Sequence, residues 1–195
     1  KALLLATIML VSLVHAQALE INARAADPPV CDADRGANWT VGTIQCNDNI
    51  SEGYTLFSPM PTSTSYLIDN EGRLVHNWTS PGGHRPGMSA YLLDDGSLLR
   101  TANIAQTAVG NFSGGGTGGK VERISWEGEL LWSFEYSSTE YISHHDIEPM
   151  PNGNVLMIAW ESKNDSEGAQ AGRNPAIASD APGGSNGVWP DKIVE

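Results

Sequence analysis

The 195-residue sequence has few basic residues, few cysteines and no long hydrophobic run. Lys and Arg number 11 against 23 Asp and Glu, which gives a formal net charge of −12. Binding to nucleic acid or to anionic lipid needs a basic surface, so this balance argues against both classes of partner. The main apolar run, Ala2–Val14, is too short to span a bilayer comfortably. The acidic excess by itself indicates solubility.

The N-terminal residues are typical of a secretory signal. Lys1 precedes the apolar run, and Ala16-Gln17-Ala18 supplies small residues for cleavage after Ala18. We therefore expect a signal peptide over residues 1–18 and a periplasmic or secreted protein. A membrane anchor or a buried helix is the alternative. The sequence starts with Lys and stops in a strand-like segment, Trp189–Glu195, so we also expect residues to be missing at both ends.

The only two cysteines, Cys31 and Cys46, lie in a lead-in segment over residues 19–52. In an oxidising compartment we expect them to form one disulfide. Closing a loop of about 15 residues in this way contributes roughly 3 kcal/mol. We expect no metal site here, because two thiols without CxxC spacing or a nearby histidine supply too few ligands.

An internal repeat is the most informative feature of the chain. The segments 66–78 and 121–134 each contain two strand-like runs around an acidic-Gly turn, in which Gly72 and Gly128 take the same place. The segments 88–100 and 145–157 repeat a second pattern, in which Gly96 and Gly153 take the same place. The spacing from Gly72 to Gly128 and that from Gly96 to Gly153 agree to within a single position, which indicates a true repeat.

Each repeat predicts two hairpins and therefore four strands. Asp95-Gly96 and Asn152-Gly153 are signals for two-residue hairpin turns between apolar runs. Four-stranded units that repeat at this period are typical of β-propeller blades. We predict an all-β fold, an incomplete propeller over residues 53–195 with about two blades and the start of a third. Two unrelated hairpins in an ordinary sandwich are the alternative.

Aromatic residues and loops complete this prediction. We expect four tryptophans to pack between blades: Trp78, Trp126, Trp132 and Trp160. The segment 162–187 lacks apolar periodicity and indicates a long loop before a third unit. The glycines of segment 111–119 are not a phosphate-binding loop, because neither a following helix nor a Walker lysine is present.

Histidines gather where the chain enters the strand before each Asp-Gly or Asn-Gly turn. These segments are 84–87 and 143–146, which we take as equivalent, and the strands they enter are expected to line a propeller channel. In His144-His145-Asp146 one imidazole can act as a nucleophile or as a general acid or base, and a neighbouring carboxylate can fix its tautomer. Arg85 is a candidate anion ligand. Histidines that serve packing, and a solvated Arg85, are the alternatives.

Several stretches, in this order, resemble the arylsulfotransferase family. They cover most of residues 53–195: Tyr54–Pro59, Thr64–Asp69, Gly72–Trp78, Arg85–Gly87, His144–Glu148, Pro151–Val155, Ala159–Glu161 and Trp189–Asp191. The resemblance implies an exported six-bladed propeller that needs no cofactor. It also implies transfer of a sulfuryl group from a phenolic sulfate donor to a phenol acceptor through a sulfated histidine.

The resemblance assigns site residues only in part. It implies catalytic roles for His145 and His144 and substrate-binding roles for Arg85 and Asp146. It leaves open which histidine faces the channel, and we favour His145 as the residue nearer the strand core. It places the nucleophilic histidine and the main sulfate-binding arginine in later blades, so we expect this chain to hold only part of the active site. A non-catalytic secreted propeller that binds a ligand at its channel mouth is the alternative, and a quinoprotein-like oxidoreductase is a third possibility.

Overall fold

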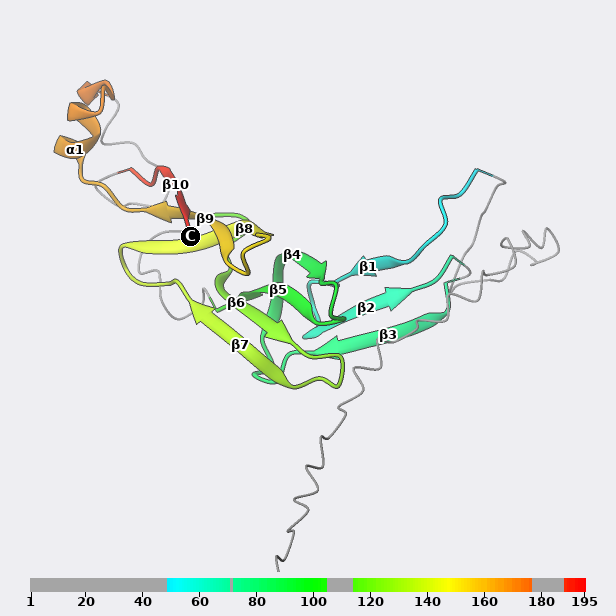
Figure 1. Cartoon of the computed structure of the whole chain (residues 1–195). Helices are drawn as coiled ribbons and strands as arrows, with labels where there is room; N and C mark the ends of the chain where they lie inside the picture. The colour runs from blue at the N-terminus through cyan, green and yellow to red at the C-terminus, as the bar shows by residue number, and fades with distance from the viewer. Residues whose placement is uncertain (1–48, 71, 105–113, 177–187) are drawn as a thin grey trace, which may run out of the picture.

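A computed structural model describes residues 49–70, 72–104, 114–176 and 188–195. These residues form ten strands and one short helix (Figure 1). The elements are β1 (Thr55–Phe57), β2 (Thr64–Ile68), β3 (Leu74–Thr79), β4 (Arg85–Leu92), β5 (Leu98–Asn103), β6 (Gly119–Ile124), β7 (Leu130–Glu135), β8 (Tyr141–Pro149), β9 (Val155–Glu161), α1 (Asp165–Gln170) and β10 (Asp191–Val194).

The strands make three antiparallel sheets in succession along the chain. The first has the order β1-β2-β3, the second β4-β5-β6-β7, and the third β10-β9-β8. The all-β prediction is therefore confirmed. Only the second sheet has four strands, and no sheet closes on itself within the described residues. Strands β4 and β8 are edge strands of neighbouring sheets and contact one another.

Four hairpin turns share one backbone hydrogen-bond pattern. In each, the glycine N–H donates to the carbonyl of the residue three positions earlier. The N–H of that earlier residue donates in turn to the carbonyl of the residue that follows the glycine. The four glycines have positive φ, between 75° and 91°: Gly72, Gly96, Gly128 and Gly153. Each loop therefore has three residues ending in glycine, a turn followed by a bulge. The expectation of two-residue turns was wrong, because Asp95 and Asn152 keep negative φ.

The repeat is offset from the sheets by one hairpin. It relates β2-β3-β4-β5 to β6-β7-β8-β9, so each repeat contributes one hairpin to each of two sheets. The first sheet consequently lacks a counterpart of β4 among the described residues, and the third lacks a counterpart of β7.

Each pair of neighbouring sheets buries a separate apolar core. Between the first and second sheets the buried residues are Leu67, Trp78, Leu98 and Ile124. Between the second and third they are Leu99, Val121, Ile147 and Met157. The two faces of the second sheet thus contribute alternate residues to different cores, as the period of a strand requires.

Two of the four tryptophans pack between sheets as predicted. Trp78 is fully buried, and Trp126 packs against the same core. Trp160 stacks on the ring of His144, which lies on the neighbouring strand β8, so this contact is within the third sheet and not between sheets. Trp132 is 43% exposed, so the prediction for this residue was wrong. Trp132 lies on the face of β7 that borders an open groove between the second and third sheets.

The segment after β9 contains a short helix that the loop prediction missed. Asn164 caps α1 by accepting a hydrogen bond from the Glu167 N–H, and the Glu167 side chain accepts one from the Asn164 N–H. This capping box supplies a local signal that a search for apolar periodicity does not detect. The predicted strand near the C-terminal end is present as β10, which pairs with β9.

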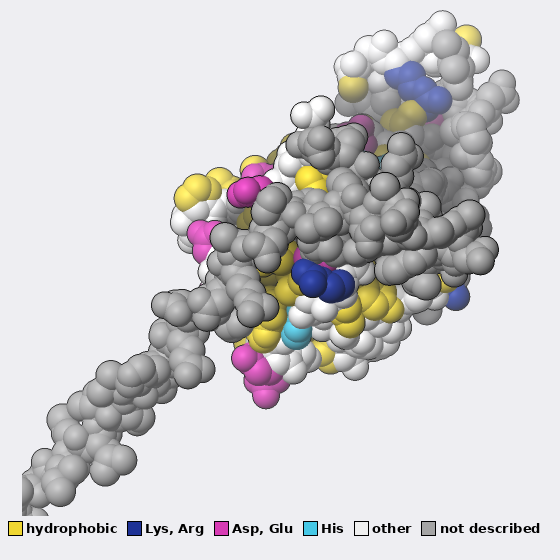
Figure 2. Space-filling model, turned by 90° about the vertical axis from the view of Figure 1, so that its right-hand side faces the viewer, with side chains coloured by type: hydrophobic (Ala, Val, Ile, Leu, Met, Phe, Trp, Pro, Cys, Tyr) yellow, Lys and Arg dark blue, Asp and Glu magenta, His cyan; other side chains and the backbone are white. Residues whose placement is uncertain are grey.

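Several predictions lie outside the described residues. These include the signal peptide over residues 1–18 and the Cys31–Cys46 disulfide. Within the described ranges, no helix is long and apolar enough to cross a membrane. Figure 2 shows the side on which β1–β3 lie: among its described side chains, acidic groups and a few separate Lys or Arg side chains are visible.

Candidate functional site

A bulge in β8 removes the His144–Asp146 segment from regular pairing. Ser143 pairs with Ala159 and Ile147 pairs with Met157, so three residues of β8 lie opposite one residue of β9. His145 has φ of 51°, the only positive φ of a non-glycine residue in the described ranges. Such strain at a bulge often accompanies a functional site.

The glycine-rich segment supplies the bulge with backbone partners. Gly118 N–H donates to the Ser143 carbonyl at 3.0 Å, and His145 N–H donates to the Gly116 carbonyl at 2.7 Å. A Cβ atom at Gly116 would overlap the His145 ring, and Gly116 has φ of 78°. These glycines therefore permit a close approach to the histidine pair.

His144 is the buried member of the pair. Its ring stacks on Trp160 with centroids 3.7 Å apart and an interplanar angle of 19°. Its Nε2 atom lies 3.1 Å from Oδ1 of the exposed Asp191, although the groups are not aligned as a hydrogen bond, so their attraction is mainly electrostatic. Burial lowers the pKa of His144, and the Asp191 charge opposes this only in part. His144 is therefore held neutral near pH 7.

The two histidines contact one another through their Nδ1 atoms, which lie 2.8 Å apart. A hydrogen bond at this distance needs one protonated and one unprotonated nitrogen. The Asp191 carboxylate favours the proton of neutral His144 on Nε2, so His144 Nδ1 accepts and His145 Nδ1–H donates. His145 Nε2 then carries an available lone pair.

His145, which carries this Nε2 nitrogen, is the exposed member of the histidine pair. His145 borders a hollow of about 560 Å³, and its other lining residues include Phe57, Met88, Tyr91 and Asp146. The hollow lies where β1, β4 and β8 approach one another. It combines apolar side chains with an imidazole and a carboxylate, as small-molecule sites commonly do.

The Asp146 carboxylate binds the Tyr91 hydroxyl and not, as the sequence suggests, an imidazole of the histidine pair. Its Oδ1 accepts hydrogen bonds from the Tyr91 hydroxyl and from the Ile147 N–H, each at 2.9 Å. Burial, together with the hydrogen bond and charge of Asp146, raises the pKa of Tyr91 to about 12. Asp191, rather than Asp146, is the carboxylate next to the histidine pair. Sequence reasoning missed this role, although Asp191 lies in the quoted Trp189–Asp191 stretch.

Arg85 is not brought to the histidine pair. It begins β4 opposite Asn103, is exposed, and does not line the hollow beside His145. Within the described part of the chain its guanidinium makes no hydrogen bond or ion pair. The geometry therefore gives no support to a shared anion site of Arg85 and His145.

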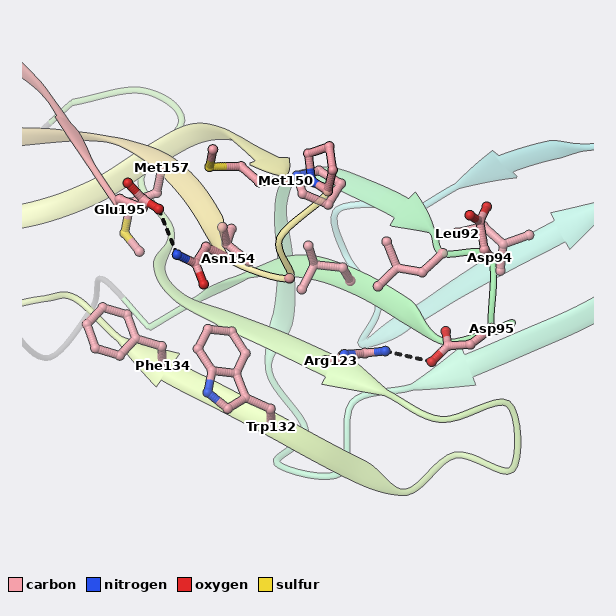
Figure 3. Close-up of a pocket in the computed structure, with 16 residues that line it drawn as sticks. Leu92, Asp94, Asp95, Arg123, Trp132, Phe134, Met150, Asn154, Met157 and Glu195 are labelled. Carbon is pink, nitrogen blue, oxygen red and sulfur yellow. Dashed lines mark hydrogen bonds and ion pairs between the residues drawn. The ribbon is translucent and has the colours of Figure 1, made fainter. Parts of the chain in front are cut away.

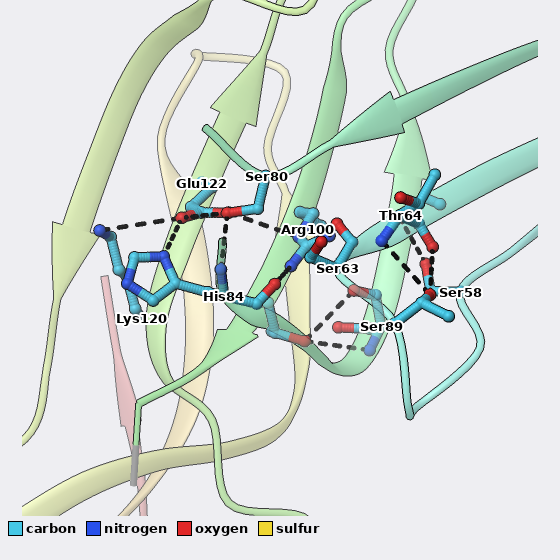
Figure 4. Close-up of polar contacts among 12 residues, drawn as sticks. Ser58, Ser63, Thr64, Ser80, His84, Ser89, Arg100, Lys120 and Glu122 are labelled. Carbon is cyan, nitrogen blue, oxygen red and sulfur yellow. Dashed lines mark hydrogen bonds and ion pairs between the residues drawn. The ribbon is translucent and has the colours of Figure 1, made fainter. Parts of the chain in front are cut away.

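His84 belongs to a second polar cluster. The strand register of the repeat aligns His84 with Tyr141, which lies three positions before His144. The segments 84–87 and 143–146, which we predicted to be equivalent, are therefore not equivalent in register. The Nδ1 atom of His84 lies 2.7 Å from Oε1 of Glu122, which also accepts a hydrogen bond from the Ser80 hydroxyl at 3.1 Å (Figure 4). The Glu122 side chain is fully buried.

Arg100 balances the buried charge of Glu122. Its Nε lies 3.5 Å from Glu122 Oε2, and its terminal nitrogens donate to the Ser63 and His84 carbonyls. Burial lowers the pKa of Arg100, and the charge of Glu122 opposes the change. The cluster ties the first sheet to the second and has a clear structural role. Sequence reasoning missed it, because Arg100 and Glu122 meet only through the register of β5 and β6.

The described residues contain no group of three or more His, Cys, Asp or Glu side chains placed to hold a metal ion. The two imidazoles at the bulge direct their facing nitrogens at each other.

Comparison with protein-family models, with curated proteins and with solved structures finds no match to this chain.

Proposed function

We propose that this protein is an exported aryl-sulfate sulfotransferase and that Asp191, His144 and His145 form part of its active site. The observation that carries the proposal is the chain of contacts from Asp191 through the buried His144 to the exposed His145. A carboxylate and an inner imidazole together orient the outer imidazole, as in other catalytic constellations.

The fold supports a propeller architecture for this enzyme. Three antiparallel sheets follow one another, the edge strands β4 and β8 are neighbours, and each repeat of the sequence advances the chain by one sheet. In a propeller such strands line the channel, and the His145 hollow would open into it. The bulges of β4 and β8 lie at equivalent positions of the repeat, which fits this arrangement.

The reaction is a transfer in two displacements. In the first, the sulfur–oxygen bond of the donor ester breaks, the phenolate leaves with the electron pair, and a sulfur–nitrogen bond forms to a histidine. In the second, the acceptor phenol loses its proton, its oxygen bonds to sulfur, and the histidine nitrogen recovers its electron pair. We assign to His145 Nε2 the uptake of the acceptor's proton, because His145 borders the hollow and its Nδ1 atom is engaged with His144.

The test uses the complete gene product with 4-nitrophenyl sulfate and phenol and follows release of 4-nitrophenol. His145→Asn tolerates the positive φ at this position but removes the imidazole. We expect it to lower kcat/KM by roughly 10²- to 10⁴-fold. Glu148→Gln, an exposed change on the same strand, is the matched control and should retain the wild-type rate.

Two outcomes would overturn the proposal. One is a wild-type protein with no phenol-dependent release, which would favour a non-catalytic binding module. The other is a His145→Asn variant that is as active as the Glu148→Gln control.

A further inference from the structure

The hollow beside His145 has an acidic lining. Among the described residues that line it, Asp146 is the only carboxylate, and neither a lysine nor an arginine is present. A sulfate ester that entered this hollow would meet a negative charge without a compensating cation. The charge of the lining therefore disfavours an anionic ligand and favours a cationic one.

The Asp146 carboxylate keeps one oxygen available for a ligand. Its Oδ1 accepts hydrogen bonds from the Tyr91 hydroxyl and the Ile147 N–H, whereas its Oδ2 accepts none from a described residue. The side chain is exposed, and no described cation forms an ion pair with it. Asp95, by contrast, is paired with Arg123 in the groove between the second and third sheets, at 2.6 Å (Figure 3). Asp146 Oδ2 can therefore accept a hydrogen bond from a bound cation.

The wider charge distribution acts in the same direction. The charge of Glu148 raises the pKa of Tyr91 together with burial and with Asp146, so the Tyr91 hydroxyl keeps its proton and donates it to Asp146. The whole chain has a formal net charge of −12. Long-range electrostatic attraction therefore draws cations, rather than anions, toward this hollow.

The apolar walls of the hollow suit an aromatic ring. Phe57 from β1 and Met88 from β4 both line it, and their side chains are about half exposed. Phe57 also stacks on Tyr66, with ring centroids 5.6 Å apart, which holds its ring in place. Aromatic and thioether side chains both make favourable contacts with aromatic rings. The volume of about 560 Å³ is within the range of small-molecule sites.

We propose that this hollow binds an aromatic compound that carries a primary ammonium group. The ammonium group donates a hydrogen bond to Asp146 Oδ2, and the ring packs against Phe57 and Met88. In the transfer reaction this ligand is the acceptor, a phenolic amine whose hydroxyl faces His145, and this assignment rests on the proposed function. The same carboxylate disfavours the aryl sulfate donor in the hollow.

The test compares three compounds that share a phenol ring and differ in charge: 4-(2-aminoethyl)phenol, 4-(2-hydroxyethyl)phenol and 4-hydroxyphenylacetate. Each is titrated near pH 7 into the complete gene product without a sulfate donor, and isothermal titration calorimetry gives the Kd. We expect the amine to bind roughly tenfold more tightly than the neutral alcohol, as the gain of one hydrogen bond to a charged group allows. The carboxylate should bind most weakly.

Three variants locate the ligand. Asp146→Asn keeps an oxygen that can accept from Tyr91 and Ile147 but removes the charge, so it should weaken amine binding roughly tenfold and leave alcohol binding unchanged. Glu127→Gln, an exposed change in the β6–β7 turn, alters the net charge equally and is the matched control, which should bind the amine like the wild type. Met88→Ala should weaken the binding of amine and alcohol alike, because it removes a wall that the ring contacts.

Equal Kd values for the amine and the alcohol, or equal losses in Asp146→Asn and Glu127→Gln, would overturn the proposal. Unchanged amine binding in Met88→Ala would also overturn it, because the ring would then lie elsewhere. Failure of the enzymatic function gives a different result. A protein that binds the amine through Asp146 but releases no 4-nitrophenol contradicts the sulfotransferase activity and supports the ligand class. A protein that transfers to phenol without preferring the amine contradicts the ligand class alone.

Discussion

The two intersheet contacts of this chain arise from one repeated sequence pattern but reach different states. Between the first and second sheets, Leu67, Trp78, Leu98 and Ile124 make a closed core. Between the second and third, a core of Leu99, Val121, Ile147 and Met157 is also buried, but the counterparts of the first core, Arg123, Phe134 and Val155, line an open groove. Hairpins and their turns thus form from local sequence, whereas the closure of an intersheet contact depends on the side chains that the following hairpin contributes.

Removal of the equivalent aromatic residues should show the largest difference between the two contacts. Trp78→Ala should lower the free energy of unfolding by about 3–5 kcal/mol, because it leaves a cavity in a closed core. Phe134→Ala should change it by only about 0.5 kcal/mol, as an exposed substitution does. Urea denaturation of both variants measures the two values. Similar losses would contradict the distinction between closed and open contacts.

The buried charges of the first contact offer a second comparison. Arg100 and Glu122 correspond to Met157 and Val194 at the second contact. Glu122→Val should lower the free energy of unfolding by about 3–5 kcal/mol, because Arg100 is left buried without its counter-charge. The double variant Arg100→Met with Glu122→Val copies the apolar pair and should lose less than the single variant. A double variant less stable than Glu122→Val would show that the apolar pair does not fit this site.

The His144 environment predicts a pH-dependent stability of the third sheet. Burial lowers the pKa of His144 in the folded protein, so the unfolded chain binds a proton that the folded one does not. Stability should be full above the ordinary histidine pKa of about 6.5 and should fall as the pH drops through and below it. His144→Phe keeps an aromatic ring against Trp160 and should flatten the dependence of Tm on pH in this window. An unchanged profile would contradict a neutral buried His144.

The smallest effect is expected at the open groove. Arg123→Leu introduces the residue type of its counterpart Leu67 and removes the half-exposed ion pair with Asp95. Such pairs contribute about 0–1 kcal/mol, so the free energy of unfolding in urea should shift by no more than that. The reverse change, Leu67→Arg, places a charge in a closed core and should cost severalfold more. Equal costs would indicate that the two contacts are packed alike.

Sequence patterns predict the parts of this fold that depend on local residues. The four glycines that mark the repeat occupy the positive-φ positions of four alike turns. The count of loop residues was wrong, because an Asp-Gly pair serves a three-residue turn with a bulge as well as a two-residue turn. The capping box of α1 was overlooked for a similar reason, since it carries no apolar periodicity.

The candidate site depends on long-range register and was predicted only in part. The His144-His145 pair is adjacent in sequence and easily noticed. Which ring faces outward is decided by the bulge of β8 and by the approach of Gly116, and neither follows from strand alternation. Asp191 reaches the pair only because β10 pairs with β9. Arg85 and His84 lie elsewhere because β4 and β8 align two residues away from the predicted register.

The central claim is that Asp191 and His144 orient His145 so that its Nε2 nitrogen is unprotonated and available. A long-range ¹H–¹⁵N correlation spectrum of the imidazoles, recorded above the ordinary histidine pKa of about 6.5, tests this directly. The account predicts the proton on Nε2 in His144 and on Nδ1 in His145. The opposite assignment, with His145 protonated on Nε2, would contradict it.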